Sequence, residues 1–287
     1  MKLSDHAYGV ILTLPGIILL VLLIIYPLAQ LIHLSLLRYD LIHPVTFIGL
    51  NNYKEILSDP YFWRSVEKML IFASGTTTLT FLISLILAHS LGRITKGAGI
   101  LRTIIIFPWA VPAAVSGIFW VWMFDPVYGL ISNISKQLGF GPISIMLDGR
   151  WAMVGVILSD TWVRIPSVTL MLLAGLQSIP QELYDSARVD GADILQTFRY
   201  ISLPLNKRQM FYTIFITYLF SSRTIDTIVT MTQGGPAKAT YVLGYYFFDT
   251  LYVDKFFGKA AAVGVVLLII CVAITLTLGR LFMRREE

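Results

Sequence analysis

The feature that most constrains this chain is a series of six long apolar runs, each bounded by charged residues. A bilayer core about 30 Å thick needs about 20 apolar residues in a helix that rises about 1.5 Å per residue. The runs lie at about 9–37, 69–91, 100–124, 152–177, 209–231 and 260–282. They predict an all-α, polytopic membrane protein with six transmembrane helices, organised as one domain over 1–287.

Composition supports this class and excludes others. The 287 residues are 56% hydrophobic and only 14% charged, against roughly a quarter charged in soluble domains. The net charge of +5 could suggest nucleic acid. However, the basic residues lie in short segments between apolar runs, where lipid headgroups and the positive-inside rule explain them more simply. We therefore expect a lipid bilayer, and no nucleic acid, among the partners.

The residues that most often bind metals are sparse and scattered. Cys271 is the single cysteine and lies in an apolar run, which excludes a disulfide framework and a cysteine cluster. The four histidines show no ligand spacing. They are His6, His33, His43 and His89. The sequence therefore predicts no metal site.

Lys and Arg near the ends of the runs predict the orientation. The short connection after the second run and the C-terminal tail are basic, as cytoplasmic segments are. The residues concerned are Arg93, Lys96, Arg102, Arg280, Arg284 and Arg285. The first run follows Lys2 and is longer than the apolar core of a signal peptide, so we expect an uncleaved spanning helix. Six spans then place both termini and segment 178–208 in the cytoplasm, and loops 38–68, 125–151 and 232–259 outside.

Segment 178–208 is polar and carries its own helix signals. Ser178 and Gln181 have capping-box spacing, and Pro180 suits a first turn. Gly191 can take a positive φ and end this first helix. Asp193 can cap a second helix, which Pro204 is expected to stop. The pattern predicts a helical hairpin whose apolar positions need a partner surface. These positions are Leu183 and Ala187 in the first helix, and Ile194, Phe198 and Ile201 in the second.

By itself, such a hairpin could simply lie on the inner leaflet as an amphipathic element. Its spacing is more specific. Asp185-Ser186-Ala187 is followed by three residues, Gly191, nine residues and then Ile201-Ser202-Leu203-Pro204. This resembles the Glu-Ala-Ala motif in the last large cytoplasmic loop of the permeases of ATP-binding cassette (ABC) importers. Asp185 replaces the usual Glu, and Ser186 the usual Ala.

Motifs elsewhere extend the resemblance over nearly the whole chain. They are similar to the carbohydrate branch of the family, which includes the maltose and glycerol-3-phosphate permeases. The segments are FPWAVP at 107–112, WVWMF at 120–124, WVRIP at 162–166, LAGLQSIP at 173–180, Asp226, and TQGGP at 232–236.

The resemblance implies a type I importer permease whose hairpin is a coupling element that seats in an ATPase subunit. The implied coupling residues are Glu182, Asp185, Ser186, Ala187, Asp190, Gly191, Phe198 and Pro204. The chain has no G-x-x-x-x-G-K-[ST] loop, so ATP and magnesium are expected on partners and no catalytic residue or cofactor on this chain. The implied partners are a second homologous permease, two ATP-binding subunits and an extracytoplasmic solute-binding protein, in the cell membrane of a bacterium or archaeon.

Charged pairs inside two spans are candidates for the substrate pathway, because ionisable groups are costly in a bilayer. Asp160 and Arg164 are four apart, and Arg223 and Asp226 three apart, so each pair could form a salt bridge on one helix face. Trp162 and Ser222 add an aromatic surface and a hydroxyl, which suit a sugar. The pairs could equally pin helices together or hold an outer gate closed. The sequence does not name the sugar or polyol.

Other functions remain as alternatives. An ion-coupled secondary transporter of a small polar solute would use inverted repeats and broken helices, and no convincing repeat is visible. A membrane-embedded enzyme would need a catalytic constellation that the spans lack. Pro108, Pro112 and Pro166 lie inside predicted spans, where proline kinks a helix, and kinks suit a protein that rocks between two openings.

Overall fold

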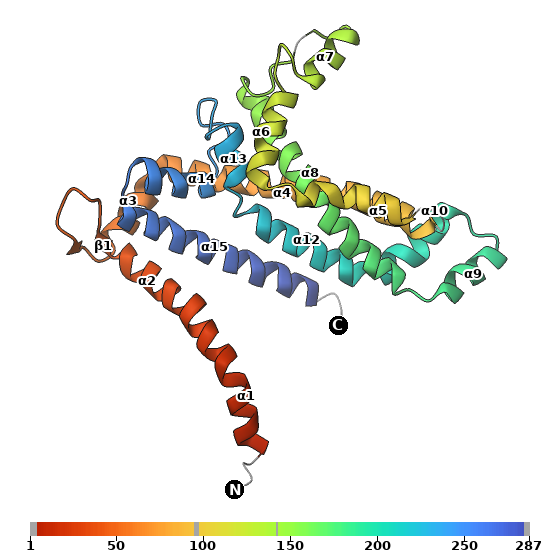
Figure 1. The fold of residues 1–287 in the computed structure, drawn as a ribbon, viewed down its shortest axis with the longest axis horizontal. Helices are drawn as coiled ribbons and strands as arrows, with labels where there is room; N and C mark the ends of the chain where they lie inside the picture. The colour runs from red at the N-terminus through yellow and green to blue at the C-terminus, as the bar shows by residue number, and fades with distance from the viewer. Residues whose placement is uncertain (1–4, 95–97, 142, 284–287) are drawn as a thin grey trace. The chain divides into compact units, whose positions relative to one another are not determined.

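The computed structural model describes residues 5–94, 98–141 and 143–283, and Figure 1 traces its elements in chain order. Lys2, Lys96, Arg284 and Arg285, which contributed to the predicted orientation, lie outside these residues. The chain divides into two compact units, Met1–Trp63 with Tyr246–Ile270 and Arg64–Tyr245 with Cys271–Glu287. Within the described residues, the sole sheet is one pair of two-residue antiparallel strands, β1 and β2, so the expectation of an all-α chain is confirmed.

The elements follow one another in this order. They are α1 (Asp5–Leu20), η1 (Val21–Ile25), α2 (Tyr26–Ser35), β1 (Leu37–Arg38), β2 (Thr46–Phe47), α3 (Asn51–Ser58), α4 (Pro60–Arg93), α5 (Ala98–Ile106), η2 (Phe107–Ala110), α6 (Ala113–Met123), α7 (Leu130–Gln137), α8 (Gly149–Gln177), α9 (Gln181–Val189), α10 (Ile194–Thr197), η3 (Phe198–Ser202), α11 (Leu203–Leu205), α12 (Lys207–Ser221), α13 (Asp226–Met231), α14 (Leu243–Phe248), η4 (Asp249–Val253) and α15 (Phe257–Met283).

Four predicted spans are confirmed as long apolar helices: Leu12–Ser35, Pro60–Arg93, Gly149–Gln177 and Phe257–Arg280. The third predicted span is divided into Gly99–Ala110 and Ala113–Met123, which meet at 96°. Pro108 lies in the intervening turn η2, and Pro112 is the N-cap of α6, so the predicted kink is confirmed there. By contrast, α8 continues through Pro166 as a single helix.

The direction of neighbouring helices shows how the bent pair crosses the membrane. Along α4 and α8, Gly75 faces Ile157, and the Ser84 hydroxyl donates to the Ile165 carbonyl at 3.1 Å. Further along, Gly92 faces Leu173, so the two helices run in the same direction. An odd number of crossings must therefore separate them. Because α7 has 8 residues and is too short to span, the bent pair α5–α6 is one broken span.

The fifth predicted span, 209–231, is not one helix. Helix α12 ends at Ser221, and a new helix, α13, begins at Asp226. The 15 residues of α12 would cover about 22 Å, which is less than the bilayer core. Helix α12 runs antiparallel to α8, since Asn206 lies against Gly175 while Thr224 contacts Arg164. The apolar run was read as continuous because composition alone does not report a break within it.

Two wide π-turns precede prolines in the same way. Both η1 and η3 end two residues before a proline, Pro27 and Pro204 respectively. A proline ring collides with the carbonyl four residues earlier in a regular helix, and a π-turn shifts that carbonyl. The prediction that Pro204 stops the second helix of the hairpin is therefore wrong: the widened turn admits the proline, and the chain breaks at Asn206 instead.

The loop after α2, in the first unit, is ordered by side-chain contacts. The Asn52 amide donates to the carbonyls of Ser35 and Leu37 at 2.8 and 2.9 Å, which ties α3 to the end of α2. Asp40 accepts from the backbone N–H groups of His43 and Ile42 at 2.9 and 3.1 Å. These bonds, that of His43 above all, hold the pKa of Asp40 well below its usual range. These side-chain hydrogen bonds fix the conformation of the loop after α2.

Candidate functional site

Segment 178–208 forms the predicted hairpin of helices, the coupling hairpin, named for the role that the sequence resemblance implies. Helix α9 ends at Val189, and Gly191 has φ +77°. The N–H of Ala192 donates to the Ala187 carbonyl at 2.9 Å, and the N–H of Gly191 to the Arg188 carbonyl at 3.1 Å. These two bonds form a Schellman motif, which requires a left-handed residue at Gly191. A Cβ there would meet nothing within 4 Å, so backbone conformation, and not space, demands glycine.

The two predicted helix starts have different outcomes. Asp193 caps α10 as expected, and with Gln196 it forms a full capping box. The N–H of Gln196 donates to the Asp193 carboxylate at 2.7 Å, and the N–H of Asp193 donates to the Gln196 side-chain oxygen at 2.8 Å. The capping box predicted at Ser178 and Gln181 is wrong. The Ser178 hydroxyl donates backwards to the Gly175 carbonyl at 2.8 Å, and the N-cap of α9 is Pro180.

Most predicted coupling residues lie on the outside of the hairpin. Four polar residues, Glu182, Asp185, Ser186 and Asp190, are exposed, and so is Gly191. Pro204 is also exposed, whereas Ala187 and Phe198 are half-buried. Asp185 pairs with Arg188 at 3.1 Å in a solvent-exposed salt bridge.

The apolar surface of the hairpin differs from the predicted faces. Ile201 packs inward, while Leu183 and Ile194 are exposed. Val189, Leu195 and Tyr200 are 89%, 70% and 70% exposed, and sequence reasoning missed all three. All three lie in short helical elements, which have too few turns for helix periodicity to assign a face. The hairpin thus presents an apolar surface away from the bundle.

The base of the hairpin is built into the spans. Tyr184 and Ile201 pack on a buried cluster contributed by the hairpin's start, α4 and α8. Its members are Ala88, Leu91, Val168, Leu172, Leu173, Leu176 and Ile179. The Tyr184 and Ser202 hydroxyls also share a hydrogen bond of 3.1 Å between the two arms. The hairpin is therefore packed directly against the ends of α4 and α8.

Asn206 completes this joint at the break before α12. It is 2% exposed, and its amide donates to the Leu172 carbonyl at 3.4 Å. A Cβ at Gly175 would lie 2.1 Å from the Asn206 side-chain oxygen, so only glycine allows this approach of α8. Sequence reasoning missed Asn206, although an Asn two residues after a proline is a usable sign of a helix break.

Nearer the start of α8, Asp160 and Arg164 form the predicted salt bridge. The guanidinium donates to both carboxylate oxygens at 2.6 and 3.2 Å. Asp160 is 4% exposed, so this ion pair is largely removed from solvent. Arg164 also donates to the Thr224 hydroxyl at 2.8 Å, in the break between α12 and α13. The break between α12 and α13 thus makes Thr224 the third member of this network.

Aromatic rings of α6 pack on Trp162, which lies between Asp160 and Arg164 in the sequence but on another side of α8. Trp162 stacks on Phe119 with centroids 6.1 Å apart and meets Trp120 edge-on at 6.4 Å. Phe119 is 48% exposed, so the group offers an open ring face. Buried polar atoms on the same helices have no hydrogen-bond partner among the described residues: the hydroxyls of Ser116, Ser159 and Thr161 and the indole N–H of Trp120.

The second predicted ion pair is not formed. Arg223 and Asp226 are both exposed and make no salt bridge with each other, because the helix breaks between them. The Arg223 guanidinium lies 5.3 Å from the Phe220 ring centroid, and Asp226 begins α13. Ser222 is buried, and its hydroxyl donates to the Tyr218 carbonyl at 2.8 Å, so it is already satisfied within the helix.

These features together define a class: a multi-span helical membrane protein with a helical hairpin anchored at the end of its spans and a polar, aromatic site within them. Comparison with protein families agrees. Residues 80–286 match the family described as binding-protein-dependent transport system inner membrane component, and the chain belongs to it.

Curated relatives align over nearly the whole chain. The trehalose/maltose transport system permease protein MalF of Thermococcus litoralis is 31% identical, over 96% of this chain and 94% of that protein. The sn-glycerol-3-phosphate transport system permease protein UgpA of Agrobacterium fabrum is 34% identical, over 92% and 91%. The resemblance to maltose and glycerol-3-phosphate permeases is thereby confirmed, and the secondary transporter is not favoured.

A solved structure shares the fold. A bacterial alginate ABC transporter, in complex with an alginate pentasaccharide-bound periplasmic protein, matches with a TM-score of 0.82 at 19% identity, over 96% of this chain and 94% of that chain. The ABC importer permease fold predicted from the sequence is confirmed.

Proposed function

We propose that this chain forms part of the translocation pathway for a sugar or related polyol in an ABC importer, working as a single permease domain. One observation carries the proposal: helix α8 holds both the polar, aromatic site around Asp160 and Trp162 and the base of the coupling hairpin at Leu172 and Gly175. A rigid helix shared by two sites is a physical route for coupling them.

The hairpin is the proposed contact for an ATPase subunit. Its exposed apolar side chains, such as Val189 and Leu195, are of the kind that a cleft in another subunit would bury. Its base is packed into the α4–α8 cluster, so a force applied at α9 reaches the spans without passing through a loose loop. The coupling residues are those named from the sequence, with Gly191 setting the turn.

The site in the spans is the proposed substrate contact or gate. A sugar presents a ring face that stacks on an aromatic side chain and hydroxyls that need donors and acceptors. Trp162 and the half-exposed Phe119 supply the stacking surface. The Asp160–Arg164–Thr224 network supplies the donors and acceptors. Arg223, Asp226 and Ser222 lie nearby in the chain and are proposed to act at the same level. The names of the relatives, which concern maltose, trehalose and glycerol-3-phosphate, support the substrate class.

The proposed assembly contains a second homologous permease, two ATP-binding subunits that hold ATP and magnesium, and an extracytoplasmic solute-binding protein. The solved alginate transporter with its periplasmic protein supports the last of these. We place the protein in a bacterial or archaeal cell membrane with both termini cytoplasmic, on the strength of the basic segments at Arg93 and Arg280.

The test is co-purification followed by reconstitution. Tagged protein should bring down an ATPase subunit and a second permease, and the complex in proteoliposomes should take up a sugar only with ATP inside and the binding protein outside. Uptake by the tagged chain alone, driven by an ion gradient, would overturn the proposal. A panel of mono-, di- and oligosaccharides and polyols then identifies the substrate.

A further inference from the structure

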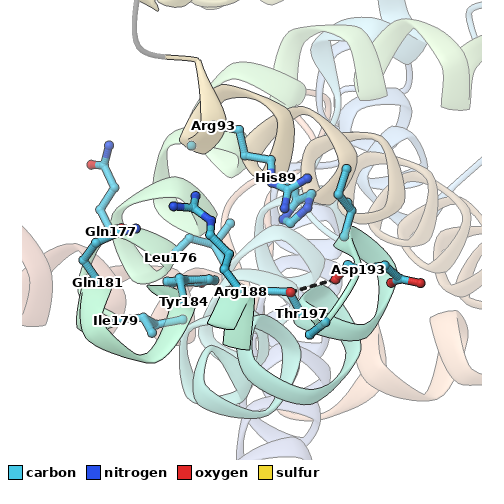
Figure 2. Close-up of a pocket in the computed structure, with 13 residues that line it drawn as sticks. His89, Arg93, Leu176, Gln177, Ile179, Gln181, Tyr184, Arg188, Asp193 and Thr197 are labelled. Carbon is cyan, nitrogen blue, oxygen red and sulfur yellow. Dashed lines mark hydrogen bonds between the residues drawn. The ribbon is translucent and has the colours of Figure 1, made fainter. Parts of the chain in front are cut away.

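A cavity of about 800 Å³ lies between the coupling hairpin and the ends of α4 and α8. Figure 2 shows its lining, which comes from all three elements. Its volume falls in the range of about 300–1,000 Å³ that is typical of small-molecule sites. The residues that matter here are His89 and Arg93 of α4, Gln177 at the end of α8, and Gln181, Tyr184 and Arg188 of α9.

The polar lining is dominated by positive charge. In Figure 2, Arg188 reaches from α9 toward the end of α4, where Arg93 and His89 lie. Within the part of the chain that the structure describes, the sole salt bridge of these two arginines is between Arg188 and Asp185, whose side chains are 72% and 57% exposed. A salt bridge so exposed to water holds the Arg188 guanidinium only weakly.

The lining contains one carboxylate, and it is already used. Asp193 accepts the N–H of Gln196 at 2.7 Å as the cap of α10. His89 also lines the cavity, but its Nε2 atom is buried and is not accessible to a guest. The cavity therefore offers two guanidinium groups and the amides of Gln177 and Gln181 to any guest, and little that would repel an anion.

Two arginines on different elements suit an anion with several oxygens. Guanidinium groups bind phosphate oxygens in pairs, and a phosphate can engage two such groups at once. The cavity lies where two spans end, which is the level of lipid headgroups, and basic pockets between helices at this level bind anionic headgroups. We propose that this cavity binds a phosphate-bearing anion, held between Arg93 of α4 and Arg188 of the coupling hairpin. Such a guest bridges the hairpin and the end of α4.

The test measures binding of two probes to the full-length protein, purified with its partner subunits in detergent. Dioctanoyl phosphatidylglycerol represents a lipid source and inorganic phosphate a soluble one, and native mass spectrometry reports occupancy of each. Arg93→Gln combined with Arg188→Gln should weaken binding roughly tenfold or more, because charge-assisted hydrogen bonds are lost at both ends of the site.

The matched control is Arg199→Gln. Arg199 is exposed on the same hairpin, 6.0 Å from the Tyr200 ring centroid, and does not line the cavity. It should leave binding within twofold. If the double variant fails to assemble, Arg93→Gln and Arg93→Lys replace it. The affinity of the lysine variant should lie between those of the wild type and Arg93→Gln, because lysine keeps the positive charge but not the paired N–H donors of a guanidinium.

The two sources are separated by competition. Binding of phosphatidylglycerol that inorganic phosphate does not displace assigns the site to a lipid headgroup, and displacement by phosphate assigns it to a soluble phosphate compound. Failure of both probes to bind, or binding that the arginine variants leave unchanged, would overturn the proposal. None of these measurements requires ATP or substrate, so the result is independent of the transport function.

Discussion

The sequence predicted the contacts of the coupling hairpin better than those of the site around Asp160. In the hairpin, Gly191 and Asp193 act on neighbours within five residues, and both behave as predicted. In the span site, Arg164 bonds to Asp160 four residues away, as predicted, but also to Thr224, sixty residues away. Local hydrogen bonds can be read from spacing, whereas partners across helices depend on where the chain breaks.

The largest expected effect on stability comes from removing the arginine of the Asp160–Arg164–Thr224 network. Arg164→Leu leaves the Asp160 carboxylate buried without a counter-ion, which should lower the free energy of unfolding by about 3–5 kcal/mol. Thermal unfolding of the purified protein in detergent measures this. Arg223→Leu is the control, because Arg223 is exposed and forms no salt bridge with Asp226. Equal losses in the two variants would show that the network is not the stabilising feature.

The second effect tests whether the hairpin turn matters for coupling rather than only for folding. Gly191→Val forces a β-branched residue to φ +77°, at a cost of about 1–2 kcal/mol, or roughly tenfold in the population of the correct turn. Uptake per ATP hydrolysed should fall by a similar factor in reconstituted vesicles.

Gly139→Val is the matched control for this turn. Gly139 has φ +84°, and a Cβ there would also meet nothing within 4 Å, but it lies outside the hairpin. The two variants should lose similar stability, while only the Gly191 variant uncouples. Full uptake by Gly191→Val at normal expression would contradict the coupling role.

A smaller effect is expected at the aromatic group. Trp162→Ala removes the ring face that is proposed to stack on the sugar; if that stacking is worth about 0.5–1.5 kcal/mol, the sugar concentration for half-maximal uptake should rise roughly twofold to tenfold. Trp122→Ala, at a ring that is 75% exposed on α6, should leave this concentration unchanged. An equal rise in both variants would remove Trp162 from the substrate site.

The smallest change in stability is expected at Asp226. It is exposed and unpaired with Arg223, so Asp226→Asn should alter the free energy of unfolding by less than about 0.5 kcal/mol. If it contacts substrate or a gate, uptake or basal ATP hydrolysis will nevertheless change. A variant with unchanged uptake, affinity and ATP hydrolysis would rule out both roles together.

The structure also shows why some expectations from the sequence were wrong. Ser178 had the spacing of a cap, but its hydroxyl bonds to Gly175 in the preceding turn, an alternative that spacing does not exclude. Pro204 was expected to end a helix, but the π-turn η3 places it without a break. Each error concerns a choice between two local geometries that the spacing of residues within the segment does not decide.

What the sequence determined by itself was the class of fold, the confirmed spans and the turn of the coupling hairpin. Apolar runs and φ-demanding residues act over one helix or one turn, so their signals are contained in neighbouring residues. What only the tertiary structure decided was the break at 222–225, the bond from Arg164 to Thr224, and the cavity that gathers Arg93 and Arg188. These arise where helices distant in the chain approach each other, and no periodicity within one segment reports that approach.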